Sequence, residues 1–311
     1  MDYPTPITEI KHRISSAHIY VKRDDLLPFS FGGNKVRIAK EFYTDMEQQG
    51  KNCMIGYGSS KSNLNRVLAN MSYLCRECHI ISPLEADGTY KATANSKMVK
   101  ECGAIIHTCE KNNVAKKVKE VIDECRQKGL QPYYIYGDEY GQGNKITPVR
   151  AYAEVYREIC EQKEKMKLEF EHIFLATGTG MTQAGLIAGR QLEAGKEQIT
   201  GISIAREKSI ERQVIADYVN AYLGSKGKDI ETKEVIVNDN YLCGGYSKYD
   251  EKIVNVIKYI FRNEGIPLDT TYTGKAFNGM LDIVSKEKIN GNVLFIHTGG
   301  TPLFLDNVGM I

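Results

Sequence analysis

Short apolar runs rich in β-branched and aromatic residues alternate along the chain with longer amphipathic stretches. The apolar runs have the length of buried strands. They occupy residues 18–24, 53–58, 79–83, 104–109, 133–137, 172–178, 199–205, 234–239 and 293–300. Between most of them lie charged stretches of helical length, such as residues 112–129 and 148–166. Strands that alternate with helices favour parallel sheets covered on both faces, so the pattern predicts an α/β fold.

The number of predicted strands is large for one small sheet, and we expect two open, twisted α/β domains with a ligand cleft between them. No low-complexity linker and no internal repeat marks a boundary, so the smaller domain is expected as an insertion. We place it at residues 48–145, which leaves residues 1–47 and 146–311 for the larger, cofactor-binding domain. Ligands of such folds bind at the strand-to-helix turns.

Composition limits the classes of partner. The 311 residues include 41 basic and 39 acidic ones, and no basic stretch is interleaved with aromatics, so no nucleic-acid partner is expected. The first residues, "MDYPTPITEIKHRISS", lack a signal pattern, and no apolar run is long enough to cross a membrane. These features predict a cytoplasmic protein without a membrane partner.

Eight cysteines in such a chain are expected to stay reduced. The segment Cys75–His79, "CRECH", fits the C-x-x-C-H pattern of haem attachment, but that chemistry normally requires export. Zinc is also not favoured, because no second ligand pair at zinc spacing follows. The favoured interpretation is a pair of reduced cysteines at a helix end, and no metal site is expected.

A glycine-rich turn follows the apolar run at residues 172–177. Its residues are Gly178, Thr179, Gly180, Met181 and Thr182. Glycines let successive N–H groups point inward, and the threonine hydroxyls add donors, so the turn can bind a phosphate at a helix N-terminus. An ordinary capped turn is the structural alternative. A dinucleotide fingerprint is a further alternative, although its third glycine is missing.

Two other turns carry candidate chemistry. Ser62 and Asn63 stand where a helix N-cap belongs, but the small polar residues around them could also hold a carboxylate. In "GGNK", Lys35 follows a Gly-Gly turn at the start of a predicted helix. An amine held behind such a turn and desolvated becomes a nucleophile suited to a Schiff base. A lysine that captures an aldehyde, together with a phosphate site, indicates pyridoxal phosphate.

Six motifs then appear in the order found in one family. They are "VKRDDLLPFSFGGNKVR", "SNLNR", "ATGTGMTQAG", "GGYS", "YTGKAFNGMLD" and "FIHTGG", which lie between about residue 20 and residue 302. The chain thereby resembles the D-cysteine desulfhydrase / 1-aminocyclopropane-1-carboxylate deaminase group of pyridoxal-phosphate enzymes. The resemblance implies the tryptophan-synthase-β-like fold and a homodimer.

The resemblance also implies roles by position. Lys35 corresponds to the lysine bound to the cofactor, and the turn Gly178–Thr182 to its phosphate loop. Asn63 corresponds to the residue that bonds the ring hydroxyl, and Ser62 to a residue that faces the substrate.

Three more positions match on the larger domain. Tyr272 corresponds to the tyrosine beside the cofactor ring, Tyr246 to a second active-site tyrosine, and Thr273 to the residue facing the pyridine nitrogen. The family's deaminases carry glutamate where Thr273 stands, and a carboxylate there strengthens the ring as an electron sink for opening a cyclopropane. A neutral hydroxyl favours elimination instead.

The chain also departs from the family pattern. Leu64 stands where histidine is usual, Ile38 where a basic residue is common, and Met181 where glycine is usual. Residues 135–145 are more acidic than the family's glycine-serine turn at that place. These departures bear on the substrate rather than on the cofactor.

The favoured hypothesis is a pyridoxal-phosphate lyase that catalyses α,β-elimination on a small amino acid, D-cysteine or a related β-substituted alanine. The products would be an α-keto acid, ammonia and sulfide or a thiol. Three alternatives stay open: a deaminase that opens the cyclopropane ring, a nicotinamide-dependent oxidoreductase, and a catalytically silent protein that binds an amino acid or the cofactor.

Overall fold

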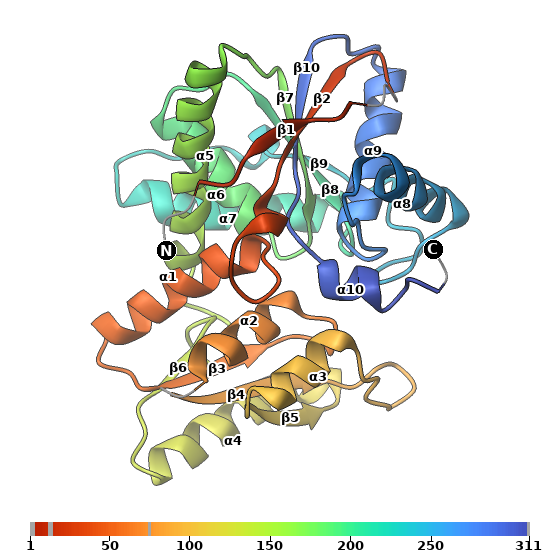
Figure 1. Ribbon diagram of the computed structural model, residues 1–311. Helices are drawn as coiled ribbons and strands as arrows, with labels where there is room; N and C mark the ends of the chain where they lie inside the picture. The colour runs from red at the N-terminus through yellow and green to blue at the C-terminus, as the bar shows by residue number, and fades with distance from the viewer. Residues whose placement is uncertain (1–3, 12–14, 74–75, 310–311) are drawn as a thin grey trace. The chain divides into compact units, whose positions relative to one another are not determined.

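The chain folds into two compact units, each with its own sheet and covering helices (Figure 1). The computed structural model describes residues 4–11, 15–73 and 76–309. Contacts group residues 1–34 and 148–311 into the larger unit and residues 35–147 into the smaller one.

The larger unit is built on a six-stranded sheet with the order β1-β2-β10-β7-β8-β9. Its strands are β1 (Ile7–Glu9), β2 (His18–Lys22), β7 (His172–Thr177), β8 (Gln198–Ser203), β9 (Ile236–Asn238) and β10 (Asn292–Ile296). β1 is antiparallel to β2, and all other neighbours are parallel. The loops after β7, β8 and β10 therefore leave the same edge of the sheet.

Helices cover both faces of this sheet. They are α5 (Ile146–Met166), α6 (Met181–Leu192), α7 (Lys208–Gly224), α8 (Glu251–Glu264), α9 (Thr273–Lys286) and α10 (Thr301–Leu305), with short 3-10 turns η1 (Asp24–Leu26) and η3 (Thr232–Glu234). α6 and α7 lie on one face, and α8 and α9 on the other (Figure 1). α5 approaches α6 so closely that a Cβ at Gly185 would lie 2.3 Å from the Cβ of Tyr152.

The smaller unit has a four-stranded, fully parallel sheet with the order β5-β4-β3-β6. Its strands are β3 (Cys53–Tyr57), β4 (Glu77–Pro83), β5 (Ile105–Cys109) and β6 (Pro132–Tyr134). Its helices are α1 (Asn34–Gln48), α2 (Asn63–Ser72), α3 (Ala94–Glu101) and α4 (Val114–Gln127), with a 3-10 turn η2 (Lys111–Asn113). α2 and α3 pack together on one face, and α4 packs against the other (Figure 1).

The α/β class and the parallel sheets expected from the sequence are confirmed. Each of the nine apolar runs overlaps a strand, and among the strands of the described residues only the short β1 was not predicted. The smaller unit begins at residue 35, whereas the sequence places the inserted domain from residue 48. The difference is α1, whose Tyr43 donates to the Leu68 carbonyl (3.0 Å) and whose Asp45 accepts from Tyr133 (2.6 Å).

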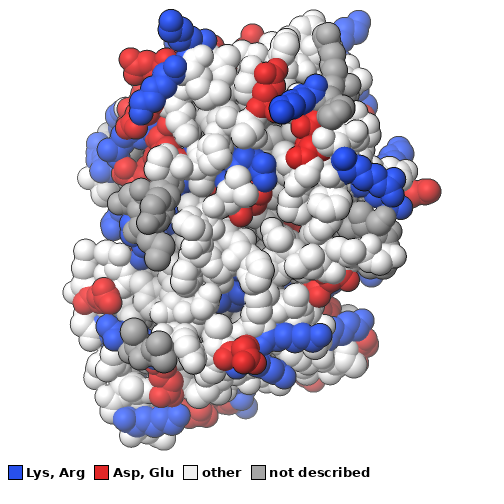
Figure 2. All heavy atoms as spheres, in the orientation of Figure 1, with Lys and Arg blue, Asp and Glu red and all other residues white. Residues whose placement is uncertain are grey.

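Charges of both signs are interspersed on the face that Figure 2 shows, in keeping with the near balance of 41 basic and 39 acidic residues. Among the helices of the described residues, none has the length and apolarity to span a membrane.

Candidate active site

A Gly-Gly turn fixes the start of α1 against the loop after β10. Gly33 has a φ of +95°, and a Cβ on it would lie 2.8 Å from the Thr298 carbonyl oxygen. The next amide, that of Asn34, donates to the same oxygen at 3.1 Å. Only glycine fits this close approach. The turn therefore determines where α1 begins, and it places Lys35 as the second residue of this helix.

Lys35 is half-buried, and its amine is desolvated. This desolvation disfavours the ammonium form and lowers the pKa of Lys35 to about 8. A substantial fraction of the amine is therefore neutral near physiological pH, which is the form that attacks an aldehyde.

The turn between β7 and α6 can hold a phosphate. α6 begins at Met181, directly after Gly180, whose φ is +80°. A Cβ at Gly180 would lie 2.9 Å from the side chain of Ile215. The first N–H groups of a helix have no acceptor inside the helix, and the helix dipole favours an anion there. The turn, residues Gly178–Thr182, thus fits the phosphate of pyridoxal phosphate.

An ion pair between the half-buried Arg206 and the buried Glu211 supports this turn. Arg206 donates to the Gly178 carbonyl at 2.7 Å and to Glu211 at 2.9 Å. Glu211 also accepts from Thr177 at 3.0 Å and is fully buried. Burial raises the pKa of Glu211, although attraction to Arg206 opposes that rise. Arg206 therefore holds the Gly178 carbonyl in place, and Glu211 in turn holds Arg206.

Asn34 connects the start of α1 to the phosphate turn. Its Nδ2 donates to the hydroxyl of Thr182 at 2.8 Å, and both side chains are buried. The Thr182 hydroxyl keeps its own proton for a further acceptor such as a phosphate oxygen. Lys35 directly follows Asn34. The predicted Schiff-base lysine is therefore the sequence neighbour of a residue that contacts the predicted phosphate turn.

Ser62 and Asn63 lie at the start of α2 in the smaller unit. The Ser62 hydroxyl accepts from the amide of Asn65 at 3.2 Å, so this serine is the N-cap of α2. Asn63 Oδ1 accepts from Asn95 Nδ2 at 2.9 Å. Asn95 is in turn held by the buried Arg66, which donates to Asn95 Oδ1 at 2.9 Å. With its oxygen engaged, Asn63 presents its NH2 group as the donor toward a ligand.

Tyr246 and Tyr272 form a pair in the larger unit. Their hydroxyl oxygens are 2.6 Å apart, and their rings meet edge to face with centroids 5.9 Å apart. The sequence placed both residues at the site separately, and the structure brings them together.

Thr273, the first residue of α9, is fully buried and bonded to Asp269. Its hydroxyl donates to Asp269 Oδ2 at 2.8 Å and accepts from the Asp269 amide at 2.9 Å. Asp269 also accepts from the amides of Thr271 (2.8 Å) and Tyr272 (2.7 Å). Burial raises the pKa of Asp269, and these amide bonds oppose the rise. Position 273 therefore carries a neutral hydroxyl whose proton is already directed to a carboxylate.

Comparison with known proteins now decides the family. Residues 2–299 match the family of pyridoxal-phosphate dependent enzymes. The chain belongs to this family.

Relatives of known name place the chain in one group within this family. The chain is 29% identical to a D-cysteine desulfhydrase of Yersinia pestis (strain Pestoides F) over 292 residues, covering 91% of this chain and 87% of the relative. It is 30% identical to a putative 1-aminocyclopropane-1-carboxylate deaminase of Pyrococcus abyssi over 308 residues, covering 96% and 90%. The crystal structure of a homologue of 1-aminocyclopropane-1-carboxylate deaminase superposes with a TM-score of 0.87 at 26% identity, covering 99% of this chain and 93% of the other. The chain is a pyridoxal-phosphate enzyme of this desulfhydrase/deaminase group, with the corresponding fold, and the nicotinamide alternative is wrong.

The sequence alone does not indicate the contacts made by a buried lysine two residues after Thr273. Lys275 is fully buried, and burial lowers the pKa of its amine. Its Nζ donates to the carbonyls of Leu242 (2.8 Å), Gly245 (2.8 Å) and Ile204 (3.4 Å). Three acceptors match the three donors of an ammonium group. Lys275 thus connects α9 by hydrogen bonds to the segment that carries Tyr246. The motif "YTGK" alone does not predict these hydrogen bonds.

We expect Lys35 to react with pyridoxal phosphate at a lower pH than an ordinary lysine. Because burial disfavours its ammonium form, the rate of covalent attachment to apoprotein should rise with pH to a plateau, with a midpoint near pH 8. Stopped-flow absorbance measures this rate, with N-acetyl-lysine as the reference amine. A midpoint at about pH 10.4, the pKa of an exposed lysine, would contradict the assignment of Lys35 as the desolvated amine.

We expect Lys275→Met to lower turnover while leaving covalent cofactor attachment intact. The change removes the donors of buried carbonyls, each worth about 1–3 kcal/mol when left unsatisfied, and releases the Tyr246 segment. Melting temperature, yellow absorbance and turnover are measured together. Lys286→Met is the control, because Lys286 is exposed on the same helix and bonded only across the surface to Asp282 among the interactions of described residues. Equal turnover in both variants would refute the role of Lys275.

Proposed function

We propose that this enzyme is a lyase that catalyses α,β-elimination on D-cysteine or a closely related β-substituted alanine. The reaction with D-cysteine consumes water and releases pyruvate, ammonia and hydrogen sulfide. The proposal concerns the substrate and the reaction, within the pyridoxal-phosphate family already established.

The observation that carries the proposal is the neutral group at position 273. Thr273 has no charge of its own, and its proton is donated to Asp269 at 2.8 Å. A neutral partner for the pyridine nitrogen leaves the cofactor a weaker electron sink than a carboxylate does. Such a sink suffices for removing an α-proton and expelling a good leaving group, whereas opening a carbon ring demands more.

The relatives include both reactions and do not separate them. A D-cysteine desulfhydrase and a putative 1-aminocyclopropane-1-carboxylate deaminase match at nearly equal identity, 29% and 30%. Ring opening of the cyclopropane acid is therefore the alternative that the experiment must separate.

Lys35 is proposed to bind the cofactor and then to act as the base at the substrate's Cα. When bound, pyridoxal phosphate supplies an electron-withdrawing ring that stabilises negative charge at Cα. The lowered pKa of Lys35, about 8, makes its neutral amine available to accept that proton near neutral pH. The phosphate turn Gly178–Thr182 would hold the phosphate, with its N–H groups fixed in advance.

The N-terminus of α2 is proposed to orient the substrate. The N-terminal amides of a helix favour an anion, so the residues around Ser62 suit the substrate carboxylate. Asn63 would donate from its NH2 group to the ring hydroxyl, because Asn95 fixes its amide with the oxygen turned away. Leu64 is buried beside them, so this position contributes no polar contact to the substrate.

The tyrosine pair is proposed to protonate or orient the leaving group. With the two oxygens 2.6 Å apart, one hydroxyl donates to the other. The tyrosine that accepts can release its own proton to the leaving sulfur, because the donated hydrogen bond stabilises the phenolate that remains. Either Tyr246 or Tyr272 can take this role.

Two properties rest on the family resemblance alone and belong to the proposal. One is the assignment of the larger unit as the cofactor-binding domain and of the smaller unit as an inserted domain. The other is assembly into a homodimer.

A substrate panel tests the proposal. Purified holoenzyme is incubated with D-cysteine, L-cysteine, β-chloroalanine, D-serine and 1-aminocyclopropane-1-carboxylate, and both α-keto acid and sulfide are measured. We expect D-cysteine or β-chloroalanine to turn over fastest. Lys35→Ala should lose ~10²–10⁴-fold in rate, the usual effect of removing a positioned base. Lys40→Ala, further along α1, is the control.

Two outcomes would overturn this reading. Faster turnover of the cyclopropane acid than of D-cysteine would refute the argument from Thr273. Turnover of no member of the panel by a yellow, Lys35-bound enzyme would refute the proposed substrate class.

A further inference from the structure

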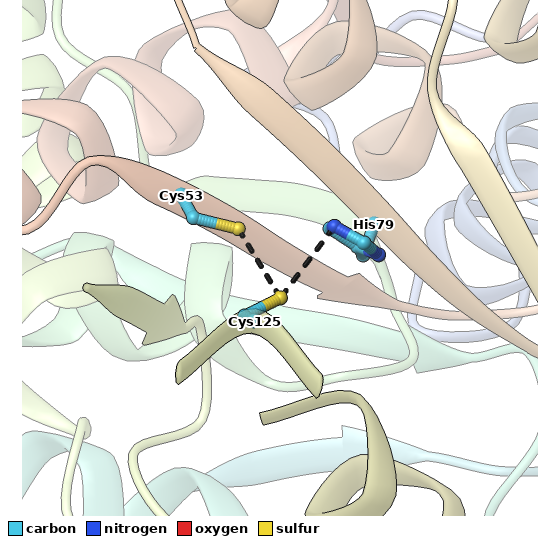
Figure 3. Close-up of side chains that lie close together, drawn as sticks. All are labelled: Cys53, His79 and Cys125. Atoms are coloured by element: carbon cyan, nitrogen blue, oxygen red, sulfur yellow. Dashed lines mark hydrogen bonds between the residues drawn. The ribbon is translucent and has the colours of Figure 1, made fainter. Parts of the chain in front are cut away.

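Three side chains that are distant in sequence meet inside the smaller unit. Cys53 on β3, His79 on β4 and Cys125 on α4 point toward one another (Figure 3). All three are buried, with at most 1% exposure. The two sulfurs are 3.6 Å apart, and Cys125 Sγ lies 3.5 Å from His79 Nε2. The donor atoms of the trio all lie within 4.8 Å of one another.

These separations resemble the edges of a tetrahedral zinc site. With Zn–S near ~2.3 Å and Zn–N near ~2.0–2.1 Å, two sulfur ligands are separated by about 3.8 Å, and a sulfur and a nitrogen by about 3.6 Å. The observed S···S and S···N distances, 3.6 and 3.5 Å, differ from these by only a few tenths of an ångström or less. The third edge, from Cys53 Sγ to a His79 ring nitrogen, is no longer than 4.8 Å, so an ion could bind after side-chain movements of about an ångström.

A fourth donor lies beside the same nitrogen. Glu77 Oε1 is 2.8 Å from His79 Nε2 and also 3.4 Å from Lys128 Nζ. The Glu77 side chain is 34% exposed, so it connects the buried trio with solvent and offers an entry path. Movement of this carboxylate toward the two sulfurs would complete four-coordination.

The opposite ring nitrogen has the partner that a metal-bound histidine needs. His79 Nδ1 lies 2.8 Å from His107 Nε2. A metal on Nε2 leaves the proton on Nδ1, from which it can be donated to His107. Such outer hydrogen bonds orient the ring and fix its tautomer in metal sites.

We propose that Cys53, His79 and Cys125, completed by Glu77, form a structural zinc site of the smaller unit. Thiolate and imidazole ligands favour zinc over magnesium or calcium. On binding, the two thiols release their protons to solvent, and no electron transfer is involved. The ion would link β3, β4 and α4, and it would stabilise the unit rather than take part in the reaction.

This arrangement differs from the metal spacing that the sequence suggested. Within "CRECH", His79 contributes, but its partners are Cys53 and Cys125 rather than the neighbouring cysteines. Cys78 is buried on the opposite face of β4, because successive side chains of a strand alternate. Cys75 lies outside the described residues.

Metal analysis tests the proposal directly. Untagged protein purified from zinc-supplemented cells should contain one zinc per chain. Cys125→Ser and His79→Gln should contain almost none, whereas Cys78→Ser should match the native protein. Zinc should also raise the melting temperature of the stripped native protein, and the shift should be lost in Cys125→Ser.

Cobalt gives a second measurement that needs no variant to fold. Native protein stripped of metal should bind one Co²⁺, with the intense thiolate charge-transfer and d–d bands of a tetrahedral site, and zinc should displace it.

Three results would overturn the proposal. The first is native protein with reduced thiols that binds neither ion. The second is equal zinc content in the native protein and the ligand variants. The third is a disulfide between Cys53 and Cys125, seen as a loss of two hydrogens in the intact mass, because it would remove both sulfur ligands.

Discussion

The close approach of two main-chain turns, at Gly33 and at Gly299, is the constraint on which the active site depends. A Cβ on Gly299 would lie 2.6 Å from the Cα of Gly33, and both residues have φ near +95°. This contact fixes the first residues of α1, so that Asn34 reaches Thr182 on the phosphate turn and Lys35 follows directly. The glycines thus link the loop after β10 with the proposed phosphate turn and with Lys35, the proposed reactive lysine.

Buried and half-buried polar groups around the candidate site satisfy one another. Lys275 donates to the carbonyls of Leu242 and Gly245, and Arg206 and Glu211 brace the phosphate turn. Buried polar and charged groups are costly when unpaired, so each of these contacts holds its partners in one arrangement. Protein groups that are fixed before the ligands arrive do not have to be ordered on binding, so less entropy is lost when they orient the cofactor and substrate.

The sequence predicts what is local. The apolar runs identify the strands. The glycine turns at residues 32–33 and 178–180 predict the lysine and the phosphate site, because each prediction depends on neighbouring residues. The Tyr246–Tyr272 pair, the contact of Asn95 with Asn63, and the cluster of Cys53, His79 and Cys125 join residues far apart in the chain. No spacing rule connects such residues, since only the folding of the sheets brings them together. The smaller unit begins at residue 35 rather than at the expected residue 48 for the same reason. Contacts of α1 with Leu68 and Tyr133 make this helix part of the smaller unit, and these contacts join residues far apart in the chain.

The account rests on Lys35 as the lysine that binds pyridoxal phosphate, and one measurement tests it most directly. The yellow holoenzyme is reduced with borohydride, digested, and mapped by mass spectrometry for the pyridoxyl-phosphate mass on each lysine. We expect the label on Lys35 in the peptide that contains "FGGNK", in about one copy per chain, with Lys275 unlabelled because its amine is engaged by main-chain carbonyls. Stoichiometric label on any other lysine, with Lys35 unmodified, would contradict the account.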